Sequence, residues 1–198
     1  MKMLKFVMPV LAMGFAANAA MGVTSTWIVD IENIVPDTVA NALFVDGQGG
    51  DWTGTALRID LTAGSAYQDA FEVAGGGAPN SAFFPFVPTL EFDTYFGIVD
   101  DSTGGIAGGA GDLGAGPFSQ NAPQISVTWF NTAQTDTSLV QIANITLSDD
   151  AEGTWELYGT FSGDQIFDGG LVRAGEIIPE PATLAFMGLG GIAALRRR

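Results

Sequence analysis

Residues 55–62 read TALRIDLT and alternate between apolar and polar side chains. The apolar positions are Leu57, Ile59 and Leu61, and the polar positions between them are Arg58 and Asp60. Because successive side chains of a β-strand point to opposite faces of a sheet, the alternation predicts a strand with one buried face and one solvated face. Strands of this kind are typical of antiparallel sheets.

Five further segments show the same alternation, and Gly, Asp, Asn and Pro separate them. Their apolar positions are Trp27, Val29 and Ile31; Leu90, Phe92, Phe96 and Ile98; Ile125, Val127 and Trp129; Ala143, Ile145 and Leu147; and Trp155, Leu157 and Phe161. This rhythm predicts an all-β fold, an antiparallel β-sandwich of jelly-roll or cohesin-like type over about residues 23–175. A helical turn is expected only at residues 66–74. The four tryptophans, Trp27, Trp52, Trp129 and Trp155, are expected in the core or at its rim.

The connection at residues 101–117 reads DSTGGIAGGAGDLGAGP and is rich in glycine. It is expected to form a flexible surface loop and no packed strand. Within it, GAGDLG at residues 109–114 matches the dinucleotide-binding pattern GxGxxG. A dinucleotide site needs a buried strand before this pattern and a helix after it, and neither is predicted here.

The charge distribution is strongly acidic, with 22 Asp and Glu against 7 Lys and Arg. Five of the basic residues lie near the chain ends, which leaves only Arg58 and Arg173 in the middle of the chain. A domain with so few cations is expected not to bind nucleic acid or an anionic membrane surface, and to attract divalent cations.

The sequence contains no Cys, which can act as a nucleophile, and no His, the usual general base. A disulfide, a thiol nucleophile and a Ser-His-Asp triad are therefore excluded. Glu91 and Asp93 lie about 7 Å apart along a predicted strand and would suit a glycosidase pair. Carboxylates on the outer face of a sheet are more often simply solvated, so we expect no enzyme.

The C-terminal residues 179–198 read PEPATLAFMGLGGIAALRRR. Pro179, Glu180 and Pro181 precede an uncharged apolar segment, and three arginines follow it, which fits the positive-inside rule. The segment is predicted to be a transmembrane helix with the anchor residues Ala182, Leu184, Phe186, Leu189, Ile192, Leu195, Arg196, Arg197 and Arg198. A helix that spans a bilayer needs about 20 apolar residues, so this shorter run suits a transient anchor.

This order of parts resembles the PEP-CTERM sorting signal of bacterial surface proteins. The resemblance implies that a membrane transpeptidase, exosortase, recognises Pro179-Glu180-Pro181 and processes the tail after transient anchoring in the inner membrane. A tail anchor without a sorting role is the alternative. Tails of this kind are also catalogued as an ice-binding protein C-terminal motif, but the chain lacks the regular Thr array that ice binding requires. The middle of the chain is similar to exported β domains of an uncharacterised type.

The N-terminus reads as a secretory signal peptide at residues 1–19. Lys2 and Lys5 precede an apolar stretch, and Ala17 and Ala19 form a small-residue cleavage site before Ala20. The expected organisation is thus a signal peptide at 1–19, an acidic β-sandwich domain at 20–178 and a sorting tail at 179–198.

Calcium is the one candidate cofactor. Its expected ligands lie in acidic turns and are Asp46, Asp51, Asp149, Asp150 and Glu152. None of these turns has the EF-hand register.

The leading hypothesis for function is an exported, non-catalytic structural or adhesive component of the cell surface or extracellular matrix. The alternative is a carbohydrate-binding or cohesin-like recognition module, with extracellular polysaccharide as its partner. In that case the aromatic side chains expected to be exposed and to stack on sugar rings are Trp52, Tyr67, Tyr95 and Phe130.

Overall fold

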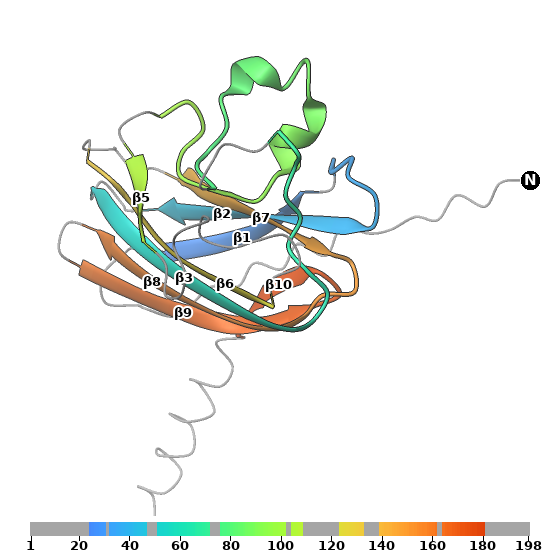
Figure 1. Ribbon diagram of the computed structural model, residues 1–198. Coiled ribbons are helices and arrows are strands. Elements are labelled where there is room, and N and C mark those ends of the chain that lie inside the picture. Colours follow the sequence, from blue (N-terminus) through green and yellow to red (C-terminus); the bar gives the residue numbers. More distant parts are fainter. Residues whose placement is uncertain are drawn as a thin grey trace, which may run out of the picture.

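The chain forms two antiparallel sheets that pack face to face (Figure 1). The computed structural model describes residues 24–30, 32–46, 51–71, 76–101, 104–108, 123–132, 139–161 and 164–180. The predicted signal peptide, the segment at 181–198 and the glycine pattern at 109–114 lie outside these residues. The arrangement confirms the predicted antiparallel β-sandwich.

The smaller sheet has the strand order β1-β2-β7-β4. Its strands are β1 (Thr24–Asp30), β2 (Thr38–Asp46), β7 (Val140–Ser148) and β4 (Tyr95–Phe96). The larger sheet has the order β10-β9-β8-β3-β6-β5. Its strands are β3 (Trp52–Ala63), β5 (Gly104–Gly108), β6 (Gln124–Asn131), β8 (Glu152–Phe161), β9 (Asp164–Arg173) and β10 (Glu176–Pro179).

The hydrophobic core fills the space between the two inner faces. Its largest fully buried side chains are Trp52, Trp129, Trp155, Leu43, Leu57, Ile59, Ile125, Ile142, Ile145, Leu147 and Leu157. The Trp27 ring meets Trp155 edge-on at a centroid distance of 5.4 Å, and these two residues come from opposite sheets. All four tryptophans are buried, and the inward positions predicted for residues 55–62 are confirmed.

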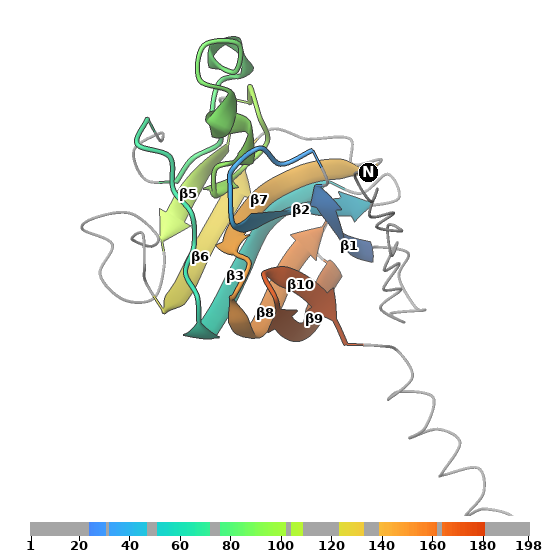
Figure 2. The same ribbon diagram turned by 90° about the vertical axis from the view of Figure 1, so that its right-hand side faces the viewer.

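A third layer covers the outer face of the smaller sheet. The chain between β3 and β4 crosses this face and includes two 3-10 helices, η1 (Ser81–Phe83) and η2 (Pro88–Phe92), which lie beyond β2 and β7 in Figure 1 and Figure 2. Val35, Ala40 and Phe92 form a small second cluster beneath it. Strands β2 and β7 of the smaller sheet are therefore covered on both faces, whereas Ile28 of β1 is exposed.

Residues 90–98 do not form the single strand that alternation predicted. Residues 88–92 form η2, which has a proline in its first turn, and only residues 95 and 96 pair with β7. Asp93 was expected on a solvated face but is buried, where its carboxylate accepts the backbone N–H groups of Asp69 and Thr94. Tyr95 is buried as well. Both differences arise because the third layer, and not water, covers this part of the chain.

Two other local predictions differ from the structure in the residues that it describes. Of the predicted helical turn at 66–74, the described residues 66–71 contain no helix, and Ala66 instead forms a β-bridge with Leu147. Within the predicted glycine loop, Gly104–Gly108 forms strand β5 at an edge of the larger sheet. Glycine weakens a strand but does not exclude pairing at an edge, and at Gly104 and Gly105 an added Cβ would lie within about 3.0–3.3 Å of Phe130.

A buried polar contact joins the two sheets. Ser25 on β1 donates its hydroxyl to Asp168 Oδ2 on β9 at 2.7 Å, and the N–H of Gly169 donates to Asp168 Oδ1 at 2.8 Å. Burial raises the pKa of Asp168 above its ordinary value, against the effect of these two hydrogen bonds. The charged form of Asp168 therefore costs folding free energy.

Replacing Asp168 by Asn removes this charge and keeps two hydrogen-bonding atoms in place. We expect D168N to raise the free energy of unfolding at pH 7 by about 1 kcal/mol, and Tm by ~3 °C. Because the folded-state pKa lies above the unfolded one, the wild-type protein gains stability from this group at low pH and loses it as pH rises through the folded pKa.

Thermal denaturation across about pH 4 to 7 measures this difference, with the exposed Asp149→Asn as matched control. The wild type should approach D168N in stability on acidification. A D168N protein that is less stable than wild type at pH 7 would contradict the assignment.

Candidate functional site

The candidate site is the edge of the larger sheet at which the sorting tail begins. Strands β9 and β10 form a hairpin with Ala174 and Gly175 in its turn, both at positive φ (51° and 77°). Such two-residue hairpin turns match the twist of the strands they join. An added Cβ at Gly175 would lie 2.7 Å from the carbonyl oxygen of Ser148 and 2.9 Å from Val39, so the turn is fitted against the smaller sheet.

Strand β10 contains the first proline of the predicted sorting motif. Pro179 pairs with Gly170, and the N–H of Glu180 donates to the carbonyl oxygen of Gly169 at 2.9 Å. The indole Nε1 of Trp155 donates to the carbonyl oxygen of Ile178 at 3.2 Å. The sandwich thus continues to Glu180, beyond the predicted boundaries at 175 and 178. A proline is tolerated because an edge strand leaves one row of its backbone groups unpaired.

Asn41 of β2 fixes the beginning of the same strand. Its side chain is fully buried, and its Nδ2 donates to the carbonyl oxygens of Gly175 at 2.9 Å and Ile145 at 3.1 Å. Its Oδ1 accepts the N–H of Ile177 at 2.9 Å. One amide therefore holds the hairpin of the larger sheet against the smaller sheet. Sequence analysis missed this residue, because an Asn within an unrecognised strand carries no local signal.

Two adjacent glycines of β9 let β10 approach. At Gly170, an added Cβ would overlap the carbonyl oxygen of Ile178 and lie 2.9 Å from the backbone nitrogen of Glu180. At Gly169, an added Cβ would meet Trp155 and Glu156 of β8 and no atom of β10 within 4 Å. Close pairing of the sorting motif therefore depends on Gly170 and not on Gly169.

The other predicted parts of the tail and of the signal peptide lie outside the described residues. These are Pro181, the anchor residues Ala182, Leu184, Phe186, Leu189, Ile192, Leu195, Arg196, Arg197 and Arg198, and the cleavage-site residues Ala17, Ala19 and Ala20. In the described part of the chain, no helix is long and apolar enough to cross a membrane.

The predicted calcium ligands do not come together within the described residues, where no three carboxylates gather closely enough to hold a metal ion. Asp149 and Asp150 lie in the exposed turn between β7 and β8. Glu152 accepts the N–H of Ala174 at 3.3 Å through its Oε1. Asp46 and Asp51 flank residues 47–50, which lie outside the description. Calcium binding stays a prediction.

The aromatic residues expected to stack on sugars are placed differently from the prediction. Trp52 and Tyr95 are 1% and 4% exposed and belong to the core, whereas Tyr67 and Phe130 are partly buried. Trp52 donates its Nε1 to Thr55 Oγ1 at 2.8 Å. A substitution of Trp52 would therefore test folding and not sugar binding.

The outer face of the larger sheet carries a different aromatic group. Tyr158 on β8 and Phe167 on β9 are about half exposed, and their ring centroids lie 4.8 Å apart. A shallow depression, which we call the outer trough, lies beside them across β3 and β6. Ala56 pairs with Tyr158, and Gly54 pairs with Phe130, so small residues separate the aromatic rings. Alternation predicted an outward Tyr158, but the strand that carries Phe167 was not predicted.

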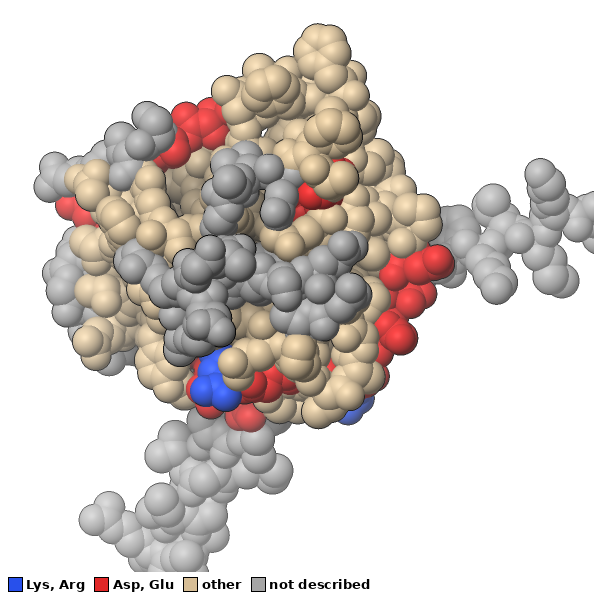
Figure 3. All heavy atoms as spheres, in the orientation of Figure 1, with Lys and Arg blue, Asp and Glu red and all other residues tan. Residues whose placement is uncertain are grey.

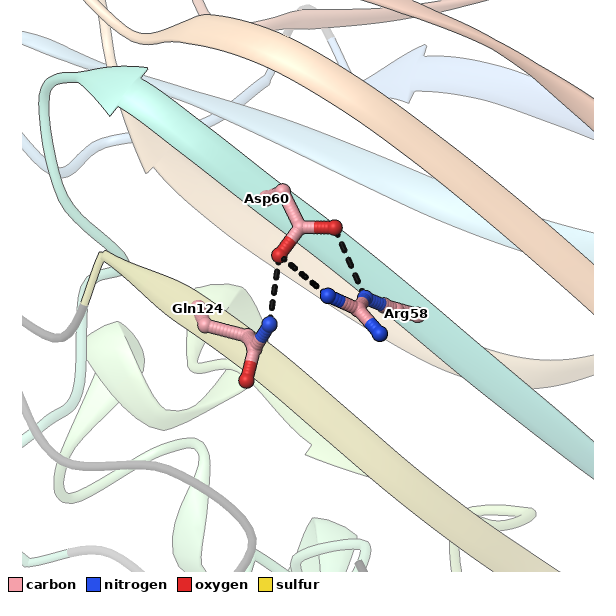
Figure 4. A network of polar contacts seen from close by, with 3 residues as sticks. All are labelled: Arg58, Asp60 and Gln124. Carbon is pink, nitrogen blue, oxygen red and sulfur yellow. Dashed lines mark hydrogen bonds and ion pairs between the residues drawn. The ribbon is translucent and has the colours of Figure 1, made fainter. Parts of the chain in front are cut away.

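Next to the outer trough, charged and amide side chains form a surface network (Figure 4). Arg58 donates its Nε to Asp60 Oδ2 at 2.7 Å, and Gln124 donates its Nε2 to Asp60 Oδ1. The hydrogen bond from Arg58, followed by that from Gln124, lowers the pKa of Asp60. These side chains are well exposed, so the network adds little stability.

The surface charge agrees with the composition. Asp and Glu appear at several places on the face drawn in Figure 3, most densely along its lower right border, whereas Lys and Arg of the described residues appear only at its lower edge. The domain that precedes the predicted sorting motif is therefore acidic, and its described surface has few cationic side chains.

Comparison with known proteins identifies the tail. Residues 178–198 match the PEP-CTERM protein-sorting motif, so the chain carries this motif at its C-terminus as the resemblance implied. The motif implies export, sorting to the cell surface and processing by an exosortase. A comparison with the curated proteins found no match.

Among solved structures, the chain aligns with one from a type II cohesin-X-dockerin complex of Acetivibrio cellulolyticus, described as the Coh3ScaB-XDoc_M1ScaA complex. The TM-score is 0.35 and the identity is 11%, over 78% of this chain and 91% of that chain. The sandwich architecture rests on the strands and their pairing. The cohesin-like assignment stays a prediction.

Replacing Asn41 by Ala should destabilise the protein through the hairpin. The substitution leaves the buried N–H of Ile177 and the carbonyl oxygen of Gly175 without their partner, which we expect to lower the free energy of unfolding by about 2–3 kcal/mol. Chemical denaturation measures the loss. Asn80→Ala, at an exposed cap of η1, is the control and should cost less than about 1 kcal/mol. Equal losses in both variants would show that Asn41 has no special role.

Proposed function

We propose that the protein is a non-catalytic structural or adhesive component of the cell surface or extracellular matrix. One observation carries the proposal: a sorting motif at residues 178–198 continues directly from the last strand of an acidic β-sandwich. The folded domain is the part that is delivered to the surface, and the tail is the signal that directs it there. The acidic surface favours solubility outside the cell and self-repulsion between copies.

The side-chain inventory supports a role without catalysis. The sequence has no His to act as a base near neutral pH and no Cys to act as a nucleophile. The one carboxylate pair that sequence analysis singled out does not face a common substrate, because Glu91 is exposed and Asp93 is buried against backbone N–H groups. This pair therefore supports no glycosidase mechanism.

The proposed route begins with export behind the signal peptide at 1–19. The apolar segment from Ala182 to Leu195 then holds the chain in the inner membrane, and an exosortase processes it at Pro179-Glu180-Pro181. In a bacterium that contains an exosortase, surface material should contain a species that begins near Ala20 and lacks Arg196, Arg197 and Arg198. Intact-mass analysis identifies this species.

The control for this route is the same chain in an isogenic strain without the exosortase, where full-length C-termini should remain in the membrane. Deletion of residues 181–198, which leaves β10 complete, should also abolish surface attachment, because the folded domain then lacks the apolar segment and the arginines of the tail. Recovery of only full-length C-termini from the membrane of both strains would support a plain tail anchor instead.

A second candidate function is carbohydrate recognition at the outer trough. Exposed rings of Tyr158 and Phe167 beside a floor of small residues offer flat apolar faces, and Thr160 and Gln165 supply polar groups at the margin. Because the domain is acidic, a neutral polysaccharide is the expected ligand. This interpretation replaces the buried Trp52 and Tyr95 by exposed aromatic residues of β8 and β9.

Affinity electrophoresis against a panel of neutral polysaccharides tests this candidate. Tyr158→Ala and Phe167→Ala should each weaken binding by about three- to tenfold, because each removes one stacking partner. Phe83→Ala, a similarly exposed aromatic position in the third layer, is the matched control and should bind as wild type. Equal retardation of wild type and the Tyr158 variant would exclude the trough as the binding surface.

A further inference from the structure

We propose that the sheet edge holds the first half of the sorting motif, and that exosortase acts on chains in which Ile178, Pro179 and Glu180 have left β9. The docking of β10 would then restrain sorting, and this restraint would be part of the folded domain itself. This inference rests on the sorting route proposed above. It adds a conformational step that precedes recognition by the enzyme.

The contacts of the docked motif carry the argument. One side of the motif is occupied, since Pro179 pairs with Gly170 and the N–H of Glu180 is bound to Gly169. The carbonyl oxygen of Ile178 accepts the Trp155 indole N–H. An enzyme that recognises an extended segment uses its main-chain groups and side-chain positions. While these groups are engaged with β8 and β9, a membrane enzyme can reach only the outward side of the motif.

The short distance between the sandwich and the membrane gives an independent reason for the release of residues 178–180. Only Pro181 separates Glu180 from the apolar segment that begins at Ala182. With β10 docked, the sandwich would therefore lie directly against the membrane surface. Each residue freed from the edge lengthens the tether by up to about 3.3–3.6 Å, so release of three residues gives about 10 Å of extended chain. The proposed release supplies both the free motif and the room for the enzyme.

The strand is built to open in part. Ile177 is buried, and its N–H is held by Asn41, so the chain up to this residue is anchored to the core. Beyond it, Ile178 and Pro179 are only half-buried, and Glu180 is exposed. Edge segments with few buried contacts open at low free-energy cost compared with the global unfolding of a domain. The boundary between the fixed and the releasable part lies between residues 177 and 178.

A reversible covalent clamp tests the proposal in the full-length chain. Leu171 and Ile178 are paired across β9 and β10, so Leu171→Cys with Ile178→Cys places two thiols within disulfide distance. The natural chain has no cysteine, so no other disulfide can form within one chain. In an exosortase-containing bacterium, the oxidised double variant should be processed at least tenfold more slowly than wild type in a pulse-chase experiment. Added reductant should restore the rate, and each single-cysteine variant should behave as wild type.

The opposite change should accelerate processing. Gly170→Ala places a Cβ against Ile178 and Glu180, whereas Gly169→Ala makes the same chemical change without contact to β10 and is the matched control. Loss of about one net hydrogen bond shifts an opening equilibrium by about fivefold, so Gly170→Ala should be processed about fivefold faster than Gly169→Ala. Hydrogen exchange at the Glu180 amide should rise by a similar factor, which confirms that the edge has opened in a folded protein.

The outcomes separate this inference from the function on which it rests. Processing of the clamped variant at the wild-type rate, or equal rates for the two glycine variants, would overturn the restraint and leave the sorting route intact. Absence of processed protein in every variant, wild type included, would overturn the sorting route itself and the restraint with it.

Discussion

The buried amide of Asn41 is the interaction on which the C-terminal end of this sandwich depends. Two of its hydrogen bonds reach Gly175 and Ile177, which lie in the hairpin of the opposite sheet. A buried polar side chain of this kind is costly unless its partners are present, so it permits only one placement of the hairpin. Because β10 is the last strand, that placement also determines where the sorting tail leaves the domain.

The sequence predicted three strands whose outer faces meet water, β3, β6 and β8, but it missed β9, whose outer face is solvated as well. The alternation at residues 55–62 and in the segments that became β6 and β8 survives in the structure, since each has one core face and one solvated face. Strand β2 was missed, and the third layer covers its outer face, as it covers that of β7, which was predicted. Four consecutive residues of β2, Asn41 among them, are buried, and the period of two disappears. No local sequence pattern indicates which segment will cover a sheet.

The sorting motif was predictable and its docking was not, for the same physical reason. Pro179, Glu180 and Pro181 are recognisable from their order along the chain, which requires no knowledge of the fold. Their attachment to β9 depends on Gly170 and on the Trp155 indole, both brought there by other strands. The aromatic residues show the converse error. The recognition-module alternative required Trp52 and Tyr95 at the surface, but both are buried, because the exposure of a ring is decided by the strands and layers that lie over it.

In this chain the folded domain and the sorting motif share residues, so one short strand has to meet two opposing requirements. Strand β10 closes the end of the core through Ile177, so weakening it exposes apolar surface of an otherwise buried layer. The same strand continues into the motif, so strengthening it withdraws main-chain groups from the processing enzyme. Burial, and to a smaller extent the like charge of Glu180, raises the pKa of Asp168, so the exposed end of the motif lies near a second carboxylate. A division between a buried anchor at 177 and a half-exposed segment from 178 onward satisfies both demands without any change in the remaining strands.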